Sequence, residues 1–315
     1  MHVLLTGRID AAEREQWRLA LRDTAPECTW WSDDDGEMPR EAISAAVVAN
    51  PAPGALAGLP QLRLVQSLWA GVEKLLADAT LPPQVPLARM VDPAMSAAMA
   101  ETALWAVLSL HRGFFDYATQ QRVCDWQQRA QRRAEALSVL VLGLGHMGRA
   151  VATRLAAQAY RVSAWHATHG HRPALPGVAV HAGVDALATL LPVSEIVVNL
   201  LPLTAATRSL LDARFFAALP SGASVVNFAR GAHVVDDDLL AALDSGHLRH
   251  AVLDVFRNEP LPPEHRYWQH PRVTMLPHVA ALTDVHSGAQ VVAANLRALR
   301  DGAPLAHLVD RARGY

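Results

Sequence analysis

The sequence predicts an α/β fold in which parallel β-sheets are covered by helices on both faces. Short apolar runs alternate along the chain with longer segments in which apolar residues recur at helical spacing. Strands that alternate with helices usually pair in parallel, and parallel sheets are normally buried on both faces. A glycine-rich turn follows one predicted strand and charged residues follow three others. This placement is typical of an enzyme whose site lies at one edge of such a sheet.

The predicted strands fall into two sets. The first set comprises residues 2–5, 46–49, 64–67 and 87–91, and the second comprises residues 138–143, 161–165, 178–181, 195–201, 223–228, 250–255 and 272–276. A long helical segment at 95–117 separates the two sets, and an amphipathic helix at 284–302 follows the last strand. Because no strand comes after that helix, we expect it to pack back on the first set.

This organisation predicts two α/β domains. A chain of 315 residues, 51% of them hydrophobic, is long enough to bury two separate cores. We expect a discontinuous smaller domain from residues 1–96 and 285–315 and a larger domain from residues 97–284. An active site is then expected in the cleft between the domains.

Composition and charge exclude several classes of function. The formal net charge is −2, so the protein offers no basic field to nucleic acid or to an anionic membrane surface. The most apolar window, "EIVVNLLPLTAATRSLL", is interrupted by Asn199, Pro202 and Arg208, and the N-terminal apolar run is too short for a signal peptide. The two cysteines match no metal-ligand spacing. We expect a soluble cytoplasmic protein that acts on a small molecule.

A glycine motif predicts a dinucleotide site in the larger domain. In "VLVLGLGHMGRAVATRL", Gly143-x-Gly145-x-x-Gly148 follows a predicted strand and opens a predicted helix. Glycines in this pattern allow a tight turn and the close approach of a pyrophosphate, whose charge meets the helix N-terminus. His146 and Met147 lie between the glycines and are further candidate cofactor contacts. The alternative is a glycine-rich turn without a ligand.

The end of the next strand favours NADP(H) over NAD(H). An NAD site usually has an acidic residue there that binds the ribose 2′-hydroxyl, but "SAWHATHGHR" contains none. His166, Thr168, His169, His171 and Arg172 could instead bind a 2′-phosphate. Two alternatives are a solvated polar loop and a metal site formed by the three histidines, although no carboxylate or thiolate joins them.

Three strands of the larger domain end near residues suited to catalysis. Arg230 follows one strand, Asp254 and Glu259 follow another, and His278 follows the last. An arginine can hold a carboxylate through two hydrogen bonds and polarise a neighbouring carbonyl. A histidine can protonate an oxygen while hydride reaches the adjacent carbon, and a carboxylate partner keeps that histidine protonated and oriented. The proline-rich loop "RNEPLPP" is expected to hold Glu259 against His278, which predicts a reductase that transfers hydride.

At these residues the sequence resembles the D-2-hydroxyacid dehydrogenase family, through the glycine motif and the segments "NFARG", "LDVFRNEPLP" and "LPHVAA". Within the family it most resembles the glyoxylate/hydroxypyruvate reductase A group, in "ARGAHVVDDDLLAALDSG", "YWQHPRVTMLPHVAALT" and "VDRARGY". The resemblance implies a Rossmann-type, doubly wound cofactor domain and a smaller flavodoxin-like substrate domain. It also implies a homodimer built on the cofactor domains, and reduction of glyoxylate or hydroxypyruvate to the D-2-hydroxy acid.

The resemblance also assigns roles to individual residues. It implies that Arg230, Glu259 and His278 are catalytic. The substrate would be bound by Trp69, Ala70, Gly71 and Arg230. The further residues that would contact the cofactor are Leu200, Pro202, Thr207, Phe228, Ala229, Arg230, Asp254, His278 and Ala280.

Other functions on the same fold remain open at this point. A larger 2-keto acid could be the substrate. Formate or phosphite oxidation is less consistent with the sequence, because the formate enzymes resembling this family have glutamine where this chain has Glu259. A scaffold protein that senses the nucleotide and acts as a corepressor could keep the same three catalytic residues, and would show slow turnover and a peptide-binding groove.

Overall fold

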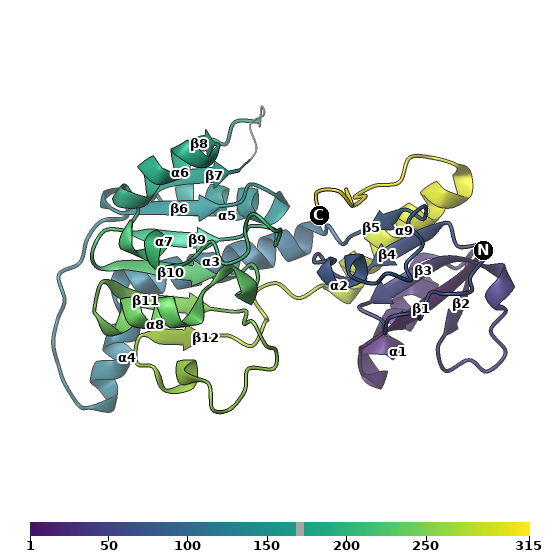
Figure 1. The fold of residues 1–315 in the computed structure, drawn as a ribbon, viewed down its shortest axis with the longest axis horizontal. Helices are drawn as coiled ribbons and strands as arrows, with labels where there is room; N and C mark the ends of the chain where they lie inside the picture. The colour runs from purple at the N-terminus through teal and green to yellow at the C-terminus, as the bar shows by residue number, and fades with distance from the viewer. Residues whose placement is uncertain (168–172) are drawn as a thin grey trace. The chain divides into compact units, whose positions relative to one another are not determined.

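The structure, a computed structural model, describes residues 1–167 and 173–315. The chain divides into two compact units, each with its own parallel sheet (Figure 1). The first unit comprises Met1–Met95 and Thr283–Tyr315, and the second comprises Ser96–Leu282. The two-sheet α/β architecture expected from the alternating pattern is therefore confirmed.

The first unit contains a five-stranded sheet in the order β2-β1-β3-β4-β5. Its strands are β1 (His2–Gly7), β2 (Thr29–Ser32), β3 (Ile43–Ala49), β4 (Leu64–Ser67) and β5 (Leu87–Ala88). All neighbours pair in parallel, and this strand order is that of the flavodoxin-like fold implied by the resemblance. The edge strand β2, "TWWS", is not among the predicted strands, and it joins the sheet through its pairing with β1.

Strand β5 is shorter than the predicted run 87–91. Only Leu87 and Ala88 pair with β4. Beyond them the backbone changes partners, because the Arg89 amide donates to the His307 carbonyl (3.0 Å) and the Met90 amide donates to the Trp69 carbonyl (3.0 Å). The C-terminal segment thus completes the edge of this sheet.

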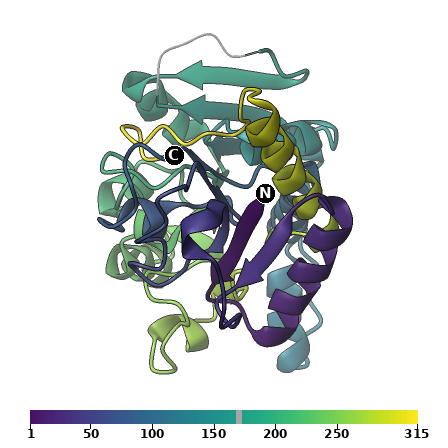
Figure 2. The same cartoon turned by 90° about the vertical axis from the view of Figure 1, so that its right-hand side faces the viewer.

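The helices of the first unit include one from each end of the chain. They are α1 (Ala11–Thr24), the short α2 (Glu73–Leu76) and α9 (Val285–Asp301). Helix α9 begins where the Asp284 side chain accepts from the Ser287 amide (2.8 Å) and ends at Gly302 in a left-handed conformation (φ 66°). It lies beside α1 (Figure 2), and the two approach so closely that a Cβ on Gly288 would be 2.7 Å from the Trp17 ring.

The second unit contains a seven-stranded parallel sheet in the order β12-β11-β10-β9-β6-β7-β8. Its strands are β6 (Ser138–Leu142), β7 (Arg161–His166), β8 (Val178–Ala182), β9 (Ile196–Asn199), β10 (Ala223–Asn227), β11 (Leu248–Leu253) and β12 (Val273–Met275). From β6 to β8, successive strands are added toward one edge of the sheet, and from β9 to β12 they are added toward the other edge. This doubly wound order confirms the Rossmann-type topology and puts the switch point between β6 and β9.

Helices cover both faces of this second sheet. Along β6, Val139 and Val141 belong to one apolar cluster and Leu140 and Leu142 belong to the other, as expected for side chains that alternate across a strand. The helices of the first cluster are α3 (Pro93–Arg112) and α5 (His146–Ala156), and those of the second are α6 (Val184–Leu190), α7 (Ala213–Ala217) and α8 (Asp236–Asp244).

The long helix predicted at 95–117 is interrupted in the structure. Helix α3 ends at Arg112, and α4 (Phe114–Arg122) starts after Gly113, which has a left-handed backbone (φ 73°). Within the described part of the chain, α3 is the one helix long and apolar enough to span a membrane by length and composition. That test is also passed by buried core helices, and α3 contributes Met99, Ala103 and Val107 to the core.

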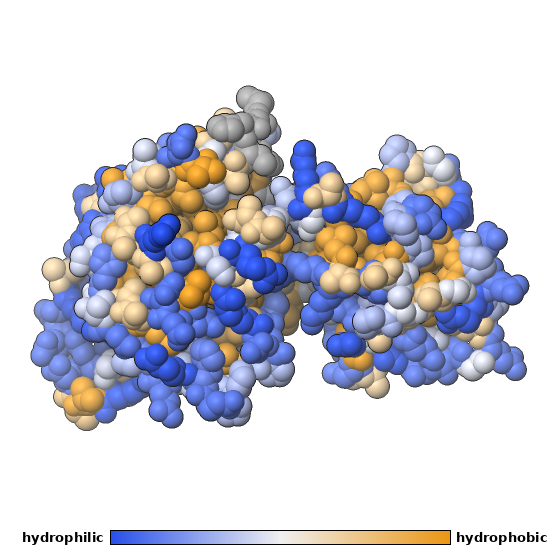
Figure 3. Space-filling model, viewed as in Figure 1, coloured by the Kyte–Doolittle hydropathy of each residue, from blue (hydrophilic) through white to orange (hydrophobic). Residues whose placement is uncertain are grey.

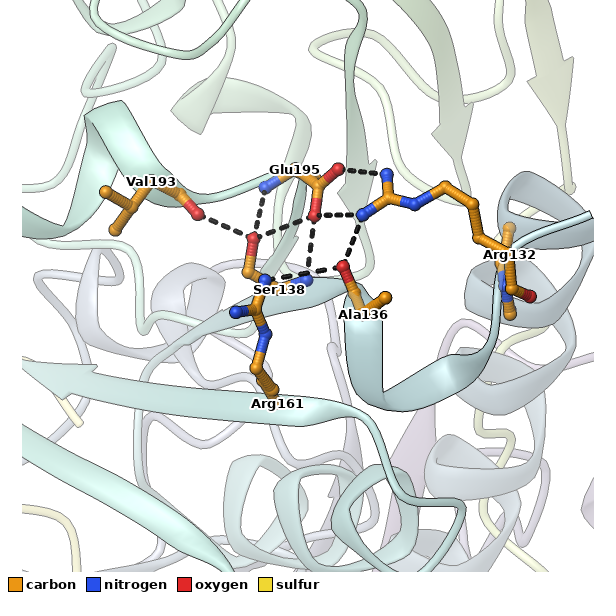
Figure 4. A network of polar contacts seen from close by, with 7 residues as sticks. Arg132, Ala136, Ser138, Arg161, Val193 and Glu195 are labelled. Atoms are coloured by element: carbon orange, nitrogen blue, oxygen red, sulfur yellow. Dashed lines mark hydrogen bonds and ion pairs between the residues drawn. The ribbon is translucent and has the colours of Figure 1, made fainter.

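The amino end of β6 is fixed by a polar network (Figure 4). Glu195 forms an ion pair with Arg132 and accepts hydrogen bonds from the Ser138 amide (3.1 Å) and hydroxyl (3.2 Å). Burial raises the pKa of Glu195, but the bonds from Arg132 and Ser138 outweigh it and hold the pKa below the usual value. The network anchors the strand at the end opposite the glycine loop.

Candidate active site

The glycine loop after β6 has a geometry that only glycine permits at two of its three positions. Gly143 has φ +98°, and a Cβ there would lie 2.7 Å from the Leu200 carbonyl oxygen. A Cβ on Gly148 would lie 1.8 Å from the Gly143 carbonyl oxygen, so α5 could not pack against the loop. Gly145 differs, because a Cβ there would meet no atom within 4 Å. The backbone is therefore closely packed around Gly143 and Gly148, whereas the side of the loop at Gly145 is open.

The open side of the loop fits a pyrophosphate. Helix α5 starts at His146, directly after Gly145, so the amide groups of its first turn point out of the helix at this position. His146 is exposed, whereas Met147 packs partly against the core. The helix start, its favourable dipole and the absence of a side chain at Gly145 together give a site for a dinucleotide phosphate.

The end of β7 is only partly described. His166 is buried and ends the strand. Thr168 and His169, the other predicted contacts for a 2′-phosphate, lie outside the described residues, as do His171 and Arg172. In the residues that the structure does describe, no three His, Cys, Asp or Glu side chains gather where they could hold a metal ion.

The segment after β10 presents Arg230. Phe228 and Ala229 are buried, whereas Arg230 is half-buried and one of its guanidinium nitrogens donates to the Ala229 carbonyl (2.6 Å). A Cβ on Gly231 would lie 1.9 Å from the carbonyl carbon of Phe256. The backbone beside Arg230 therefore touches the backbone of the loop that carries Glu259, which fixes the two loops against each other.

Glu259 and His278 are in direct contact. Their side chains meet at 2.7 Å, between Glu259 Oε2 and His278 Nδ1, and Glu259 Oε1 accepts the Phe256 amide (2.8 Å). Burial raises the pKa of Glu259, but the hydrogen bonds from His278 and Phe256 and the charge of Arg230 outweigh it, so the pKa lies below its usual value. With Nδ1 engaged, Nε2 is the nitrogen of His278 that can exchange a proton with a ligand.

Asp254 stabilises the backbone turn that carries His278. Its carboxylate is buried and accepts the amides of Val279 (2.7 Å) and Ala280 (3.1 Å), while its backbone carbonyl accepts the His278 amide (2.8 Å). Burial raises the pKa of Asp254, against these amide bonds. His278 is held with a left-handed backbone (φ 56°), which is uncommon for a residue with a side chain. The expected contact of Asp254 with the cofactor stays a prediction, and in the structure its carboxylate is bonded to this turn.

The segment after β9 is held by its own hydrogen bonds. Thr207 is buried, and its hydroxyl donates to the Pro202 carbonyl (2.7 Å) and accepts the Thr204 amide (2.8 Å). The Leu200 amide donates to the Leu142 carbonyl (2.8 Å), which places this segment beside the glycine loop. The predicted cofactor contacts Leu200 and Pro202 therefore lie at the switch point of the sheet.

The predicted substrate loop belongs to the first unit. Trp69, Ala70 and Gly71 follow β4 and are each partly exposed. The Trp69 amide donates to the Ser67 hydroxyl (3.0 Å), and its carbonyl accepts the Met90 amide. Both ends of the Trp69 backbone are thus fixed, which leaves the next two residues to turn into α2.

Three buried polar residues of the second unit, Asn199, Asn227 and His233, were not predicted to be functional. Asn199 and Asn227 end β9 and β10, and His233 follows Arg230 by three residues. The signal that could find the asparagines is an amide at the end of an otherwise apolar strand, in "IVVN" and "SVVN". His233 has no comparable signal, because its burial depends on tertiary packing.

Comparison with known proteins agrees with this arrangement. The family model described as the NAD binding domain of D-isomer specific 2-hydroxyacid dehydrogenase matches residues 104–280, more than half of the chain. The chain belongs to this family. It is therefore an NAD(P)-dependent 2-hydroxyacid dehydrogenase, as the glycine motif and the charged strand ends predict.

Solved structures resemble the dehydrogenase over both units. A D-isomer specific 2-hydroxyacid dehydrogenase from Xanthobacter autotrophicus Py2, in complex with NADPH and MES, is 37% identical, with a TM-score of 0.94 over 100% of this chain and 99% of that one. A family member from Klebsiella pneumoniae 342 is 35% identical (TM-score 0.87; 99% and 98% covered). An NADPH-dependent glyoxylate/hydroxypyruvate reductase from Sinorhizobium meliloti, in complex with NADP and sulfate, is 32% identical (TM-score 0.91; 100% and 99% covered).

Proposed function

We propose that the dehydrogenase reduces glyoxylate to glycolate, or hydroxypyruvate to the D-2-hydroxy acid, and uses NADPH as the hydride donor. The observation that carries the proposal is the contact between Glu259 and His278 (2.7 Å), in a unit that also presents Arg230 and the glycine loop at strand ends. These are the groups that carbonyl reduction needs: a proton donor, an anchor for a carboxylate and a dinucleotide site. The resemblance to the reductase from Sinorhizobium meliloti supports the substrate class.

The residues of the site have defined roles in this proposal. Arg230 binds the substrate carboxylate and polarises the carbonyl group, because a guanidinium presents paired N–H donors. A bound nicotinamide cofactor would supply the hydride for the carbonyl carbon. His278 gives its Nε2 proton to the carbonyl oxygen, which becomes a neutral hydroxyl group. Glu259 holds Nδ1 and stabilises the charged ring before the proton leaves. Ala70 and Gly71 would add backbone amides and Trp69 a pocket wall, a role that rests on the resemblance.

Two observations support NADPH as the cofactor. The described end of β7, "RVSAWHA", offers no acidic side chain to a ribose 2′-hydroxyl, which disfavours NADH. The related structures from Xanthobacter autotrophicus and Sinorhizobium meliloti contain NADPH and NADP. His166, Thr168 and His169 remain the candidates for contacts to the 2′-phosphate.

We further propose that the enzyme is a cytoplasmic homodimer formed through its second unit. Large apolar side chains are exposed on α3, on α4 and just beyond, among them Trp105, Phe114, Val123 and Trp126. Trp126 is 93% exposed, which is rare for a side chain of this size unless a partner covers it. Figure 3 shows an isolated apolar cluster at the far end of α4, low on the left of the view, within a largely hydrophilic surface.

The proposal is tested by the rate of NADPH oxidation with glyoxylate and with hydroxypyruvate, measured beside the same reactions with NADH. We expect turnover of at least one acid, a preference for NADPH, and a loss of about 10² to 10⁴ in kcat for His278→Gln. A preference for NADH would overturn the cofactor assignment. Turnover of only larger 2-keto acids would overturn the substrate assignment. Tight NADPH binding without turnover of any keto acid would favour the nucleotide-sensing scaffold.

A further inference from the structure

A chain of buried amides connects the ends of two neighbouring strands to the backbone of Arg230. Asn199 and Asn227 are register partners at the ends of β9 and β10, and both are fully buried. Asn199 Nδ2 donates to Asn227 Oδ1 (2.9 Å), and Asn227 Nδ2 donates to the Arg230 carbonyl (3.0 Å). Asn227 Oδ1 also accepts the Ala229 amide (3.3 Å). One asparagine side chain therefore holds the backbone on both sides of the Ala229–Arg230 peptide bond.

His233 extends this chain to the segment after β9. Its side chain is completely buried, with Nδ1 at 3.1 Å from the Arg230 carbonyl oxygen and Nε2 at 3.3 Å from the Pro202 carbonyl oxygen. A carbonyl oxygen only accepts, so the ring binds through whichever nitrogen carries a proton. The His233 amide also donates to the Arg230 carbonyl (3.2 Å). The imidazole thus stands between the segment after β10 and the segment after β9.

These contacts hold the backbone of Arg230 in one conformation. The Arg230 backbone is extended (φ −143°, ψ 145°), and its carbonyl accepts the Asn227 side-chain amide and the His233 backbone amide, with the His233 ring in contact beside them. Fixing the peptide plane on each side of a Cα fixes the direction of the Cα–Cβ bond, from which the guanidinium group extends. Buried polar networks of this kind are rigid when every member is paired, and they are costly to break one bond at a time.

We propose that His233 and Asn227 are positioning residues for Arg230, setting the direction of its guanidinium group and tying it to the Pro202 segment beside the glycine loop. The inference rests on the proposed function in one respect, namely that Arg230 binds the carboxylate of the keto acid. The competing explanation is that His233 only fills space in the core. A misplacement of about 1 Å in a binding group can cost 10² in rate, so the two explanations predict different kinetics.

Three variants of His233 separate these explanations. His233→Phe keeps a ring of similar size and removes both contacts to carbonyl oxygens. His233→Asn places an amide near Nδ1 and can keep the bond to Arg230, whereas His233→Gln places one near Nε2 and can keep only the bond to Pro202. His247→Gln is the matched control, because His247 also contacts a carbonyl oxygen, that of Phe216 (2.9 Å), but touches neither segment.

The measurements are kcat, the KM for the keto acid and the Kd for NADPH, together with the melting temperature of each variant. We expect His233→Phe to lower kcat/KM for the keto acid by about 10- to 100-fold while the Kd for NADPH changes less than about threefold. His233→Asn should recover most of the loss and His233→Gln should not. An unchanged kcat/KM in a folded His233→Phe protein would overturn the proposal. If His233→Phe does not fold, equal KM values for the Asn and Gln variants would overturn it.

A double-mutant cycle with Arg230→Lys tests whether His233 acts through Arg230. If it does, adding His233→Phe to the Arg230→Lys protein should cause almost no further loss. If the loss of kcat/KM in the double variant equals the product of the losses in the two single variants, His233 acts independently of Arg230, which contradicts the proposal.

Binding of oxalate to the protein loaded with NADP⁺ gives a readout that needs no turnover. Weaker oxalate binding in His233→Phe, in a protein that reduces no keto acid, would leave the positioning role intact and overturn only the proposed reaction. Oxalate binding equal to that of the unmodified protein would overturn the positioning role.

Discussion

Glu259 is a residue whose surroundings determine its charge. His278, the Phe256 amide and Arg230 lower its pKa more than burial raises it, so the carboxylate is ionised at neutral pH. Glu259→Gln keeps the size of the side chain but removes the charge that stabilises a protonated His278. We expect kcat to fall by about 10²-fold with little change in NADPH affinity, measured by steady-state kinetics and fluorescence titration. Glu264→Gln, an exposed change in the same loop, is the control. Equal activity of the two variants would contradict the assigned role.

An alanine substitution at Gly145 and one at Gly148 can be compared directly, because the two added methyl groups would enter different surroundings. Gly145→Ala enters open space, whereas Gly148→Ala meets the Gly143 carbonyl at 1.8 Å. We expect the first to weaken NADPH binding by about tenfold or more at nearly unchanged melting temperature, and the second to destabilise the fold by about 1–3 kcal/mol or more. Thermal unfolding and NADPH titration measure the two effects. Normal NADPH affinity in Gly145→Ala would argue against a pyrophosphate at this position.

At the scale of elements, regular patterns could be predicted and long-range choices could not. The strand "SVLVLG" and the glycines after it are local signals, so the start of the second sheet follows from the sequence. The end of α3 before Gly113 has no such local signal, because apolar residues continue at helical spacing on both sides of it. The helix ends there because the Gly113 backbone has a positive φ. Strand β2 is fixed by its pairing with β1. The contact between Glu259 and His278 was predictable as two strand-end residues, whereas the burial of His233 depends on two loops that meet in space.

Strand β11 contains a histidine that should make the second unit sensitive to acid. His250 is buried, stacks on Phe115 (ring centroids 4.6 Å apart) and contacts the Thr274 hydroxyl (2.9 Å). Burial lowers its pKa from 6.5 to about 4. The unfolded chain therefore takes up this proton first as the pH falls, so stability is lost between pH 6.5 and 4, by at most about 3 kcal/mol. Denaturant unfolding at pH 7 and 4.5 should show a smaller loss in His250→Gln. Equal losses in both proteins would contradict the assignment.

At the scale of the whole molecule, the exposed aromatic residues around α4 test the proposed assembly. Trp126→Ser combined with Val123→Ser should convert a dimer into a monomer, because these side chains are among the most exposed large apolar groups of the second unit. Light scattering after size-exclusion chromatography measures the mass. Trp268→Ser, at a tryptophan 54% exposed elsewhere in that unit, is the control. A protein that is monomeric before any substitution would contradict the proposed dimer.

The most direct test of the central claim follows the hydride itself. NADPH deuterated at C4 of the nicotinamide, prepared separately on each face, is incubated with the enzyme and hydroxypyruvate, and the glycerate is analysed by mass spectrometry and chiral chromatography. The proposed arrangement of Arg230, Glu259 and His278 predicts deuterium at C2 from only one of the two labelled cofactors, and D-glycerate as the product. Glycerate without deuterium from either cofactor, or the L-enantiomer, would contradict it.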